Sequence, residues 1–258
     1  MSIKASEAWS LALSEWAIPK EILEQAPESP WIHPAALFNI PNIIEMTPAH
    51  KLARELMPEG GTVLDIGCGG GLAAFATTPP ATKVIGVDHQ EDMLQMFNSN
   101  AKSRGVEAQT FLGFWPAVTN EVPMADVVTV HHVVYNVSEI VPFIAALNSH
   151  ARKRVVIEMP VEHPLATMRA AWKHFWDLDR PTKPTPDDLM SVLAEMGIAA
   201  QIKYFTGEMR NEKDLEDAVK FMRIRLCLPL EKENEVRDFF AKEKPSIARE
   251  LAVIYWDI

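Results

Sequence analysis

The stretch that decides the fold reads Val-Leu-Asp-Ile-Gly-Cys-Gly-Gly-Gly-Leu and runs from Val63 to Leu72. Its apolar first half predicts a buried strand, its glycines predict a tight turn, and a helical pattern begins at the end of the turn. Glycines allow a sharp turn and let a ligand approach main-chain atoms without a Cβ in the way. The start of a helix adds N–H groups that lack intrahelical partners. This strand–turn–helix unit is typical of a site for a nucleotide-like ligand.

The chemistry of that ligand is narrowed by the residues around the turn. The next apolar run, Lys83–Val87, ends on Asp88, and an acidic residue there can accept both hydroxyls of a ribose. A dehydrogenase would have glycine at the position of Leu72, and a phosphate-binding loop would end in Gly-Lys-Ser or Gly-Lys-Thr. Asp65, just before the turn, disfavours a pyrophosphate and suits a cationic ligand. S-adenosylmethionine carries an ammonium and a sulfonium group and no phosphate, so it fits this pattern.

The motifs Asp65–Gly71 and Gly86–Asp88 resemble the S-adenosylmethionine signature of class I methyltransferases. The resemblance extends to Ala125–Val137, which is similar to the fourth strand of that family and its active-site edge. From Trp31 through Trp176 and Arg180 the chain further resembles a largely uncharacterised bacterial subgroup. The resemblance implies an α/β fold with a Rossmann-like, doubly wound, seven-stranded mixed sheet in the order 3-2-1-4-5-7-6. The last strand is then antiparallel, an N-terminal helical cap precedes the core, and insertions follow strands five and six.

The pattern along the chain agrees with this fold. Short apolar runs alternate with helical patterns in the middle of the chain, which predicts a parallel sheet covered on both faces. We expect a single domain of 258 residues, with a helical cap at 1–50, a cofactor-binding core at 51–160, and an acceptor-side insertion with C-terminal strands at 161–258. The expected strands are Thr62–Ile66, Lys83–Val87, Ala108–Leu112, Asp126–Val130, Arg154–Glu158, Ala200–Phe205 and Glu250–Trp256.

The resemblance also implies how S-adenosylmethionine would be held and S-adenosylhomocysteine left as the product. In the family the glycine turn passes under the methionine part, and the acid after strand two holds the ribose. The acid that commonly reaches the adenine amine after strand three is missing from Leu112–Pro116, so packing on Phe114 or Trp115 would replace it. A plain core role for Trp115 is an equal alternative. The expected cofactor contacts are Asp65, Gly67, Cys68, Gly69, Asp88, His89, Met93, Gly113, Phe114, Trp115 and His131.

Two histidines stand at the carboxyl end of the fourth expected strand, where open α/β sheets bind ligands. Neighbouring strand residues face opposite ways, so we expect His131 to face the cofactor and His132 to face the acceptor. His132 is the candidate general base if the acceptor is an oxygen acid. The following Tyr135 and Asn136 do not form the Asn-Pro-Pro-Tyr pattern with which methyltransferases grip planar amines. That difference counts against DNA-adenine and peptide-glutamine acceptors.

The segment after the fifth expected strand is rich in tryptophan. Trp172 and Trp176 share one helical face, where they either dock the helix on the sheet or line an apolar acceptor pocket. Arg180 either binds an acceptor carboxylate or pairs with Asp177 or Asp179. The expected acceptor contacts are His132, Tyr135, Trp172, Trp176 and Arg180. Trp31, His33 and Phe38 are candidate parts of a cap over the cofactor.

The net charge of −10 argues against a long nucleic acid as the partner. Cys68 and Cys227 predict neither a disulfide framework nor a zinc site, and no set of residues has metal-ligand spacing. No apolar run approaches the ~20 residues of a membrane helix, and the first residues lack the apolar core of a signal peptide, so we expect a cytoplasmic protein. The sequence leaves a homodimer open.

The function that we expect is methyl transfer to a small-molecule acceptor by in-line displacement. The alternatives are an RNA or protein methyltransferase and an inactive regulator that binds S-adenosylmethionine.

Overall fold

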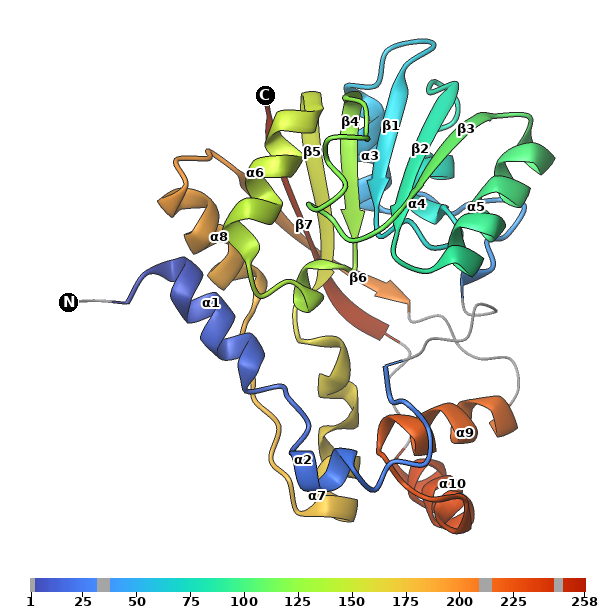
Figure 1. Ribbon diagram of the computed structural model, residues 1–258, viewed down its shortest axis with the longest axis vertical. Helices are drawn as coiled ribbons and strands as arrows, with labels where there is room; N and C mark the ends of the chain where they lie inside the picture. Colours follow the sequence, from blue (N-terminus) through green and yellow to red (C-terminus); the bar gives the residue numbers. More distant parts are fainter. Residues whose placement is uncertain (1–2, 32–37, 209–214, 244–247) are drawn as a thin grey trace.

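A seven-stranded sheet in the order β3-β2-β1-β4-β5-β7-β6 forms the centre of the molecule (Figure 1). The computed structural model describes residues 3–31, 38–208, 215–243 and 248–258. The strands are β1 (Thr62–Ile66), β2 (Lys83–Asp88), β3 (Glu107–Leu112), β4 (Ala125–His131), β5 (Ala151–Pro160), β6 (Gln201–Glu208) and β7 (Ala248–Asp257). The first five strands run parallel, and β7 is antiparallel to both β5 and β6. The predicted strand order and the antiparallel last strand are therefore confirmed.

Helices cover both faces of the sheet because its strands carry apolar side chains on both sides. In β1, Val63 packs in a cluster with α3, α4 and α5, whereas its neighbour Leu64 packs with α1, α6 and α8 on the opposite face. The helices are α1 (Ala5–Ser14), α2 (Lys20–Leu23), α3 (Pro48–Glu55), α4 (Leu72–Ala76), α5 (Glu91–Arg104), α6 (Ile140–His150), α7 (Arg169–Trp176), α8 (Pro186–Glu195), α9 (Leu215–Arg225) and α10 (Glu233–Lys242). Short 3-10 helices lie at Val134–Asn136, Pro164–Met168 and Leu230–Lys232.

A second, smaller group of helices lies beyond the carboxyl ends of β1 and β4 (Figure 1). Helices α2, α7, α9 and α10 meet there around a separate apolar cluster that includes Ile18, Trp172 and Leu226. We call these four helices the helical cap. Its parts come from both ends of the chain, because α2 precedes the sheet core and α7, α9 and α10 follow β5 and β6 as the predicted insertions.

The predicted N-terminal cap is divided between three places. Helix α1 packs beside α8 on the sheet, and the indole N–H of Trp9 donates to the carbonyl of Val137 at 2.8 Å. Helix α2 joins the helical cap. The segment from Phe38 onward reaches the glycine turn. His33 lies outside the described residues. Among the described helices, none has the length and apolarity that a membrane span requires.

Candidate active site

The glycine turn after β1 is fixed by the end of β2. The N–H groups of Gly67 and Cys68 both donate to the carbonyl of Val87, at 2.8 and 3.1 Å. Gly67 has a φ of 67°, and a Cβ on it would lie 2.4 Å from a methyl carbon of Val133. Only glycine fits at this point, because an added side chain would meet both an unfavourable backbone conformation and the segment that follows β4.

The N-terminal segment lies directly on this turn. A Cβ on Gly69 would be 2.9 Å from the ring of Phe38, and a Cβ on Gly70 would be 2.2 Å from the Phe38 carbonyl oxygen. Arg104 of α5 anchors the same segment by donating to the carbonyl of Pro41 at 2.6 Å. Phe38 is therefore in contact with the turn, as expected for a cap, whereas Trp31 is half exposed.

Asp88 connects β2 to the glycine turn. One oxygen of its buried carboxylate accepts the N–H of Gly69 at 2.9 Å, and the other accepts the N–H of Gln90 at 3.0 Å. A carboxylate offers about four lone-pair sites. Asp88 therefore keeps acceptor capacity for the hydroxyls of a ribose while it orients the turn.

An aromatic surface stands beside Asp88. The ring of His89 stacks on Phe114 with centroids 4.8 Å apart, and Phe114 is 68% exposed. Gly113 ties this region to β2 because its N–H donates to the carbonyl of Asp88 at 2.9 Å. Met93, which lies in the first turn of α5, is buried.

Trp115 has a different place from that of Phe114. Its ring belongs to the core under α6, and its indole N–H donates to the carbonyl of Phe143 at 3.4 Å. Of the two alternatives for Trp115, the packing favours the core role. Phe114 is therefore the exposed aromatic residue of this loop.

Two groups under the turn are buried. Asp65 accepts hydrogen bonds from the N–H of Ala74 and the hydroxyl of Thr129, both at 3.2 Å. Burial outweighs these bonds and raises the pKa of Asp65 to about 8. Burial likewise raises the pKa of the Cys68 thiol, so this side chain fills space as an apolar group.

The two histidines at the end of β4 differ in exposure. His131 is nearly buried and stacks on His50 of α3 with centroids 5.2 Å apart, and burial lowers its pKa to about 3. The side chain of His132 is 44% exposed. The φ of His132 is 61°, a left-handed conformation that is uncommon outside glycine.

Glu158, which the sequence analysis did not single out, joins this group from β5. Its carboxylate oxygen Oε1 lies 3.2 Å from Nε2 of His132, and Oε2 accepts the hydroxyl of Thr47 at 2.9 Å. Burial alone would raise the pKa of Glu158, but His131, His132 and the Thr47 hydrogen bond outweigh it and lower the pKa to about 2. A signal was present in the sequence, because Glu158 is an acidic residue inside an apolar run. Among the described residues, no cluster is suited to holding a metal ion.

The other expected acceptor contacts take part in packing, Tyr135 in the core of the sheet and the two tryptophans in the helical cap. Tyr135 is buried, and its hydroxyl donates to the carbonyl of Pro160 at 2.8 Å. Trp172 is fully buried, and the indole N–H of Trp176 donates to the carbonyl of Leu226 at 2.6 Å. These tryptophans pack α7 against the other cap helices.

Arg180 also belongs to the cap. Its guanidinium lies over the rings of both Trp16 and Trp172, and it donates to the carbonyl of Trp16. The expected pairing of Arg180 with Asp177 or Asp179 is replaced by Lys173, which lies 2.7 and 3.0 Å from those two carboxylates. Of the predicted acceptor residues, His132 alone combines exposure with a place at the sheet edge.

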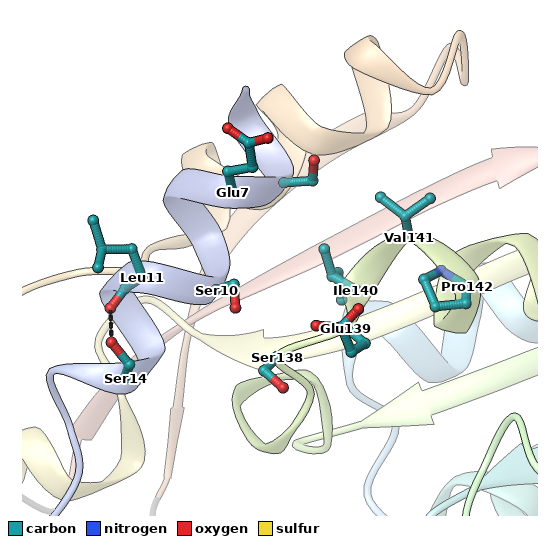
Figure 2. Close-up of a pocket in the computed structure, with 10 residues that line it drawn as sticks. Glu7, Ser10, Leu11, Ser14, Ser138, Glu139, Ile140, Val141 and Pro142 are labelled. Carbon is teal, nitrogen blue, oxygen red and sulfur yellow. Dashed lines mark hydrogen bonds between the residues drawn. The ribbon is translucent and has the colours of Figure 1, made fainter. Parts of the chain in front are cut away.

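Figure 2 shows a groove of about 500 Å³ between α1 and the start of α6. It is lined by Ser10, Leu11 and Ser14 of α1 and by Ser138–Pro142. None of the glycine turn, Asp88 or His132 contributes to this groove. It is therefore separate from the candidate site.

The core of the chain matches known proteins in sequence. Residues 63–154 match the family model described as a methyltransferase domain. The ribosomal protein L11 methyltransferase of Vibrio campbellii is 38% identical over 89 residues, which are 34% of this chain and 30% of that protein. The ubiquinone biosynthesis O-methyltransferase of Coxiella burnetii is 29% identical over 96 residues, or 36% of this chain and 41% of that protein. The matches thus span less than half of these curated relatives.

The fold matches solved structures over a longer part of the chain. The YcgJ protein from Bacillus subtilis aligns with a TM-score of 0.55 and 18% identity, over 81% of this chain and 95% of that chain. TehB from Haemophilus influenzae aligns with a TM-score of 0.51 and 15% identity, over 81% of this chain and 60% of that chain. At these identities the likeness concerns the fold.

Proposed function

We propose that this chain, whose residues 63–154 are a methyltransferase domain in a class I methyltransferase fold, transfers a methyl group from S-adenosylmethionine to a small-molecule acceptor. The observation that carries the proposal is the hydrogen bond between Asp88 and the glycine turn. The carboxylate accepts the N–H of Gly69 at 2.9 Å, so the ribose-binding acid and the turn form one unit at the carboxyl edge of the sheet.

The residues present fit the cofactor part by part. The ribose hydroxyls would donate to the open lone pairs of Asp88, and adenine would stack on the exposed ring of Phe114. The methionine part would pass along the glycines, where no Cβ stands in the way. Burial raises the pKa of Asp65, and the positive charge of a bound ligand would lower that pKa and so favour the ionised carboxylate. When bound, S-adenosylmethionine supplies an electrophilic methyl group.

A small acceptor is favoured by the charge of the chain and by the helical cap. A net charge of −10 disfavours a polyanion, and the cap lies beyond the edge at which His132 is exposed. The curated relatives are named for a ribosomal protein and for ubiquinone biosynthesis. Their matched segments span only 34% and 36% of this chain, so they do not choose between a protein acceptor and a small one.

The test uses S-adenosylmethionine with a labelled methyl group and a bacterial cell extract divided by dialysis. We expect the label to enter molecules of the small-molecule fraction, with S-adenosylhomocysteine formed in equal amount. Transfer that requires the retained protein or RNA fraction would contradict the small-molecule acceptor. Failure to bind S-adenosylmethionine at all would contradict the activity itself.

A further inference from the structure

We propose that His132 is the general base of the reaction and that the methyl acceptor is a weakly acidic hydroxyl group, such as that of a phenol or an enol. The inference rests on the proposed methyl transfer and names its acceptor class. It is carried by the pairing of an exposed histidine with a buried carboxylate at the edge of the sheet where the cofactor would end.

The contact with Glu158 determines which nitrogen of His132 can accept a proton. Nε2 of His132 lies 3.2 Å from the Oε1 atom of Glu158. An ionised carboxylate only accepts hydrogen bonds, so Nε2 carries the proton and Nδ1 carries the lone pair. No described residue hydrogen-bonds to Nδ1, and the side chain is 44% exposed. The basic nitrogen is thus open to an acceptor.

Glu158 is held as a charged positioning residue. It is 4% exposed, and it accepts the hydroxyl of Thr47, the residue that caps α3, at 2.9 Å. Its pKa of about 2 keeps it ionised at neutral pH. The other groups against it are His131 and, stacked on that ring, His50. Because burial keeps His131 neutral, His132 is the histidine whose positive charge Glu158 can balance.

The backbone holds His132 in this place at an energetic cost. Its φ of 61° is left-handed, and its N–H donates to the carbonyl of Glu158 at 2.8 Å. Such conformations in residues other than glycine persist where the surrounding structure imposes them, and they cluster at functional sites. Both the main chain and the side chain of Glu158 therefore fix His132.

In the proposed step a proton moves from the acceptor to His132 while the methyl group moves from sulfur to the acceptor oxygen. The acceptor hydroxyl gives its proton to Nδ1 of His132, and an oxygen electron pair forms the bond to the methyl carbon. The carbon–sulfur bond breaks with its electron pair moving to sulfur, which leaves neutral S-adenosylhomocysteine. The imidazolium, balanced by Glu158, then releases its proton to water. A carboxylate or an amine that is already neutral carries a free lone pair, whereas a weakly acidic hydroxyl becomes a good nucleophile only as its proton leaves, so a fixed base points to a hydroxyl.

The first measurement is the ring nitrogen NMR spectrum of histidine-labelled protein without ligand. We expect His132, assigned from its loss in His132→Gln, to carry its proton on Nε2. His174→Gln is the control, because His174 is also half exposed but lies on the helical cap. A neutral His132 with its proton on Nδ1 would overturn the proposal, because the lone pair would then face Glu158.

The second measurement is methyl transfer to catechol, a probe with weakly acidic hydroxyls, compared with 2-mercaptoethanol. We expect catechol to be methylated, and His132→Gln to lower kcat by about a hundredfold or more while cofactor affinity stays within a few-fold. Glu158→Gln should lower kcat less than His132→Gln does, because the base is retained but the imidazolium loses its counter-charge. His174→Gln should leave transfer unchanged.

The outcomes separate this inference from the proposed function. If S-adenosylmethionine binds but catechol is not methylated, or His132→Gln retains full turnover, the base and its acceptor class are overturned while the cofactor assignment stands. If calorimetry detects no cofactor binding by the wild-type protein, the proposed function fails first. Thermal unfolding of each variant shows whether it still folds. If Glu158→Gln does not fold, His132→Gln is the deciding variant, because the side chain of His132 is exposed.

Discussion

Asp65 is an acidic residue buried beneath the glycine turn of the candidate site. Its carboxyl group is 2% exposed and receives hydrogen bonds from Ala74 and Thr129. Burial, the largest cause, raises its pKa from 3.8 to about 8. The protonated form is therefore favoured on folding. The stability that this group contributes is fully present below pH 3.8 and is lost as the pH rises toward 8.

We predict that Asp65→Asn flattens part of the pH dependence of stability in the ligand-free protein. Between pH 5 and pH 8 the free energy of unfolding should fall more in the wild type than in Asp65→Asn. The reason is that the two hydrogen bonds to Asp65 do not compensate for burying its ionised carboxylate. Urea unfolding at both pH values measures this difference. Asp92→Asn, on the exposed start of α5, is the control. An identical pH dependence in wild type and Asp65→Asn would contradict the raised pKa.

At this scale the sequence identified some of the chemistry and missed the rest. Asp65 and Asp88 stand at fixed offsets from a glycine turn, and such local spacing is readable from the sequence. Glu158 becomes informative only when β4 and β5 pair and bring His131 opposite it. That pairing joins residues distant in sequence, so a run of apolar letters interrupted by one acid did not reveal the contact.

Arg180 links Trp16 to Trp172 of the helical cap, because its guanidinium lies over both rings. Trp16 stacks on His163 with centroids 3.9 Å apart, and its indole N–H donates to the carbonyl of Lys183 at 2.6 Å. Burial and nearby arginines, of which Arg180 acts most strongly, lower the pKa of His163 from 6.5 to about 3. His163 is thus neutral in the folded protein. Its contribution to stability is present above pH 6.5 and is lost as the pH falls toward 3.

We predict that acidification lowers the free energy of unfolding through His163. Between pH 7 and pH 5 the wild type should lose up to about 1.4 kcal/mol per pH unit more than His163→Asn. Asparagine retains an acceptor for the N–H of Leu165, which His163 caps at 3.2 Å. Chemical unfolding at the two pH values measures the difference, and His174→Asn is the exposed control. Equal losses in wild type and His163→Asn would count against a buried neutral histidine.

Elements formed by local pattern were predicted well, and their partners were not. The bounds of β1 are those expected at Thr62–Ile66, because an apolar run there ends directly before the glycines. The spacing of Trp172 and Trp176 correctly indicated one helical face. It could not say which surface that face meets, because the partners around Leu226 lie about fifty residues further along the chain.

In the whole molecule, the residues proposed to bind the cofactor and those proposed to act on the acceptor follow different strands at one edge of the sheet. The glycine turn and Asp88 come from β1 and β2, while His132 and Glu158 come from β4 and β5. The helical cap lies beyond the carboxyl ends of β1 and β4. The segment at Phe38, which precedes the sheet in the sequence, lies against the glycine turn. This division lets cofactor binding and acceptor chemistry be altered separately, which is what the variants at Asp88 and His132 exploit.

The most direct test of the central claim is a calorimetric titration of S-adenosylmethionine into the wild type, Asp88→Ala and the control Asp92→Ala. We predict binding of one molecule per chain, unchanged in Asp92→Ala. In Asp88→Ala it should weaken about ten- to a hundredfold, because charge-assisted hydrogen bonds to the ribose contribute ~1.5–3 kcal/mol each before water compensates. Equal affinity in Asp88→Ala, or wild-type binding of NAD as tight as that of S-adenosylmethionine, would contradict the account.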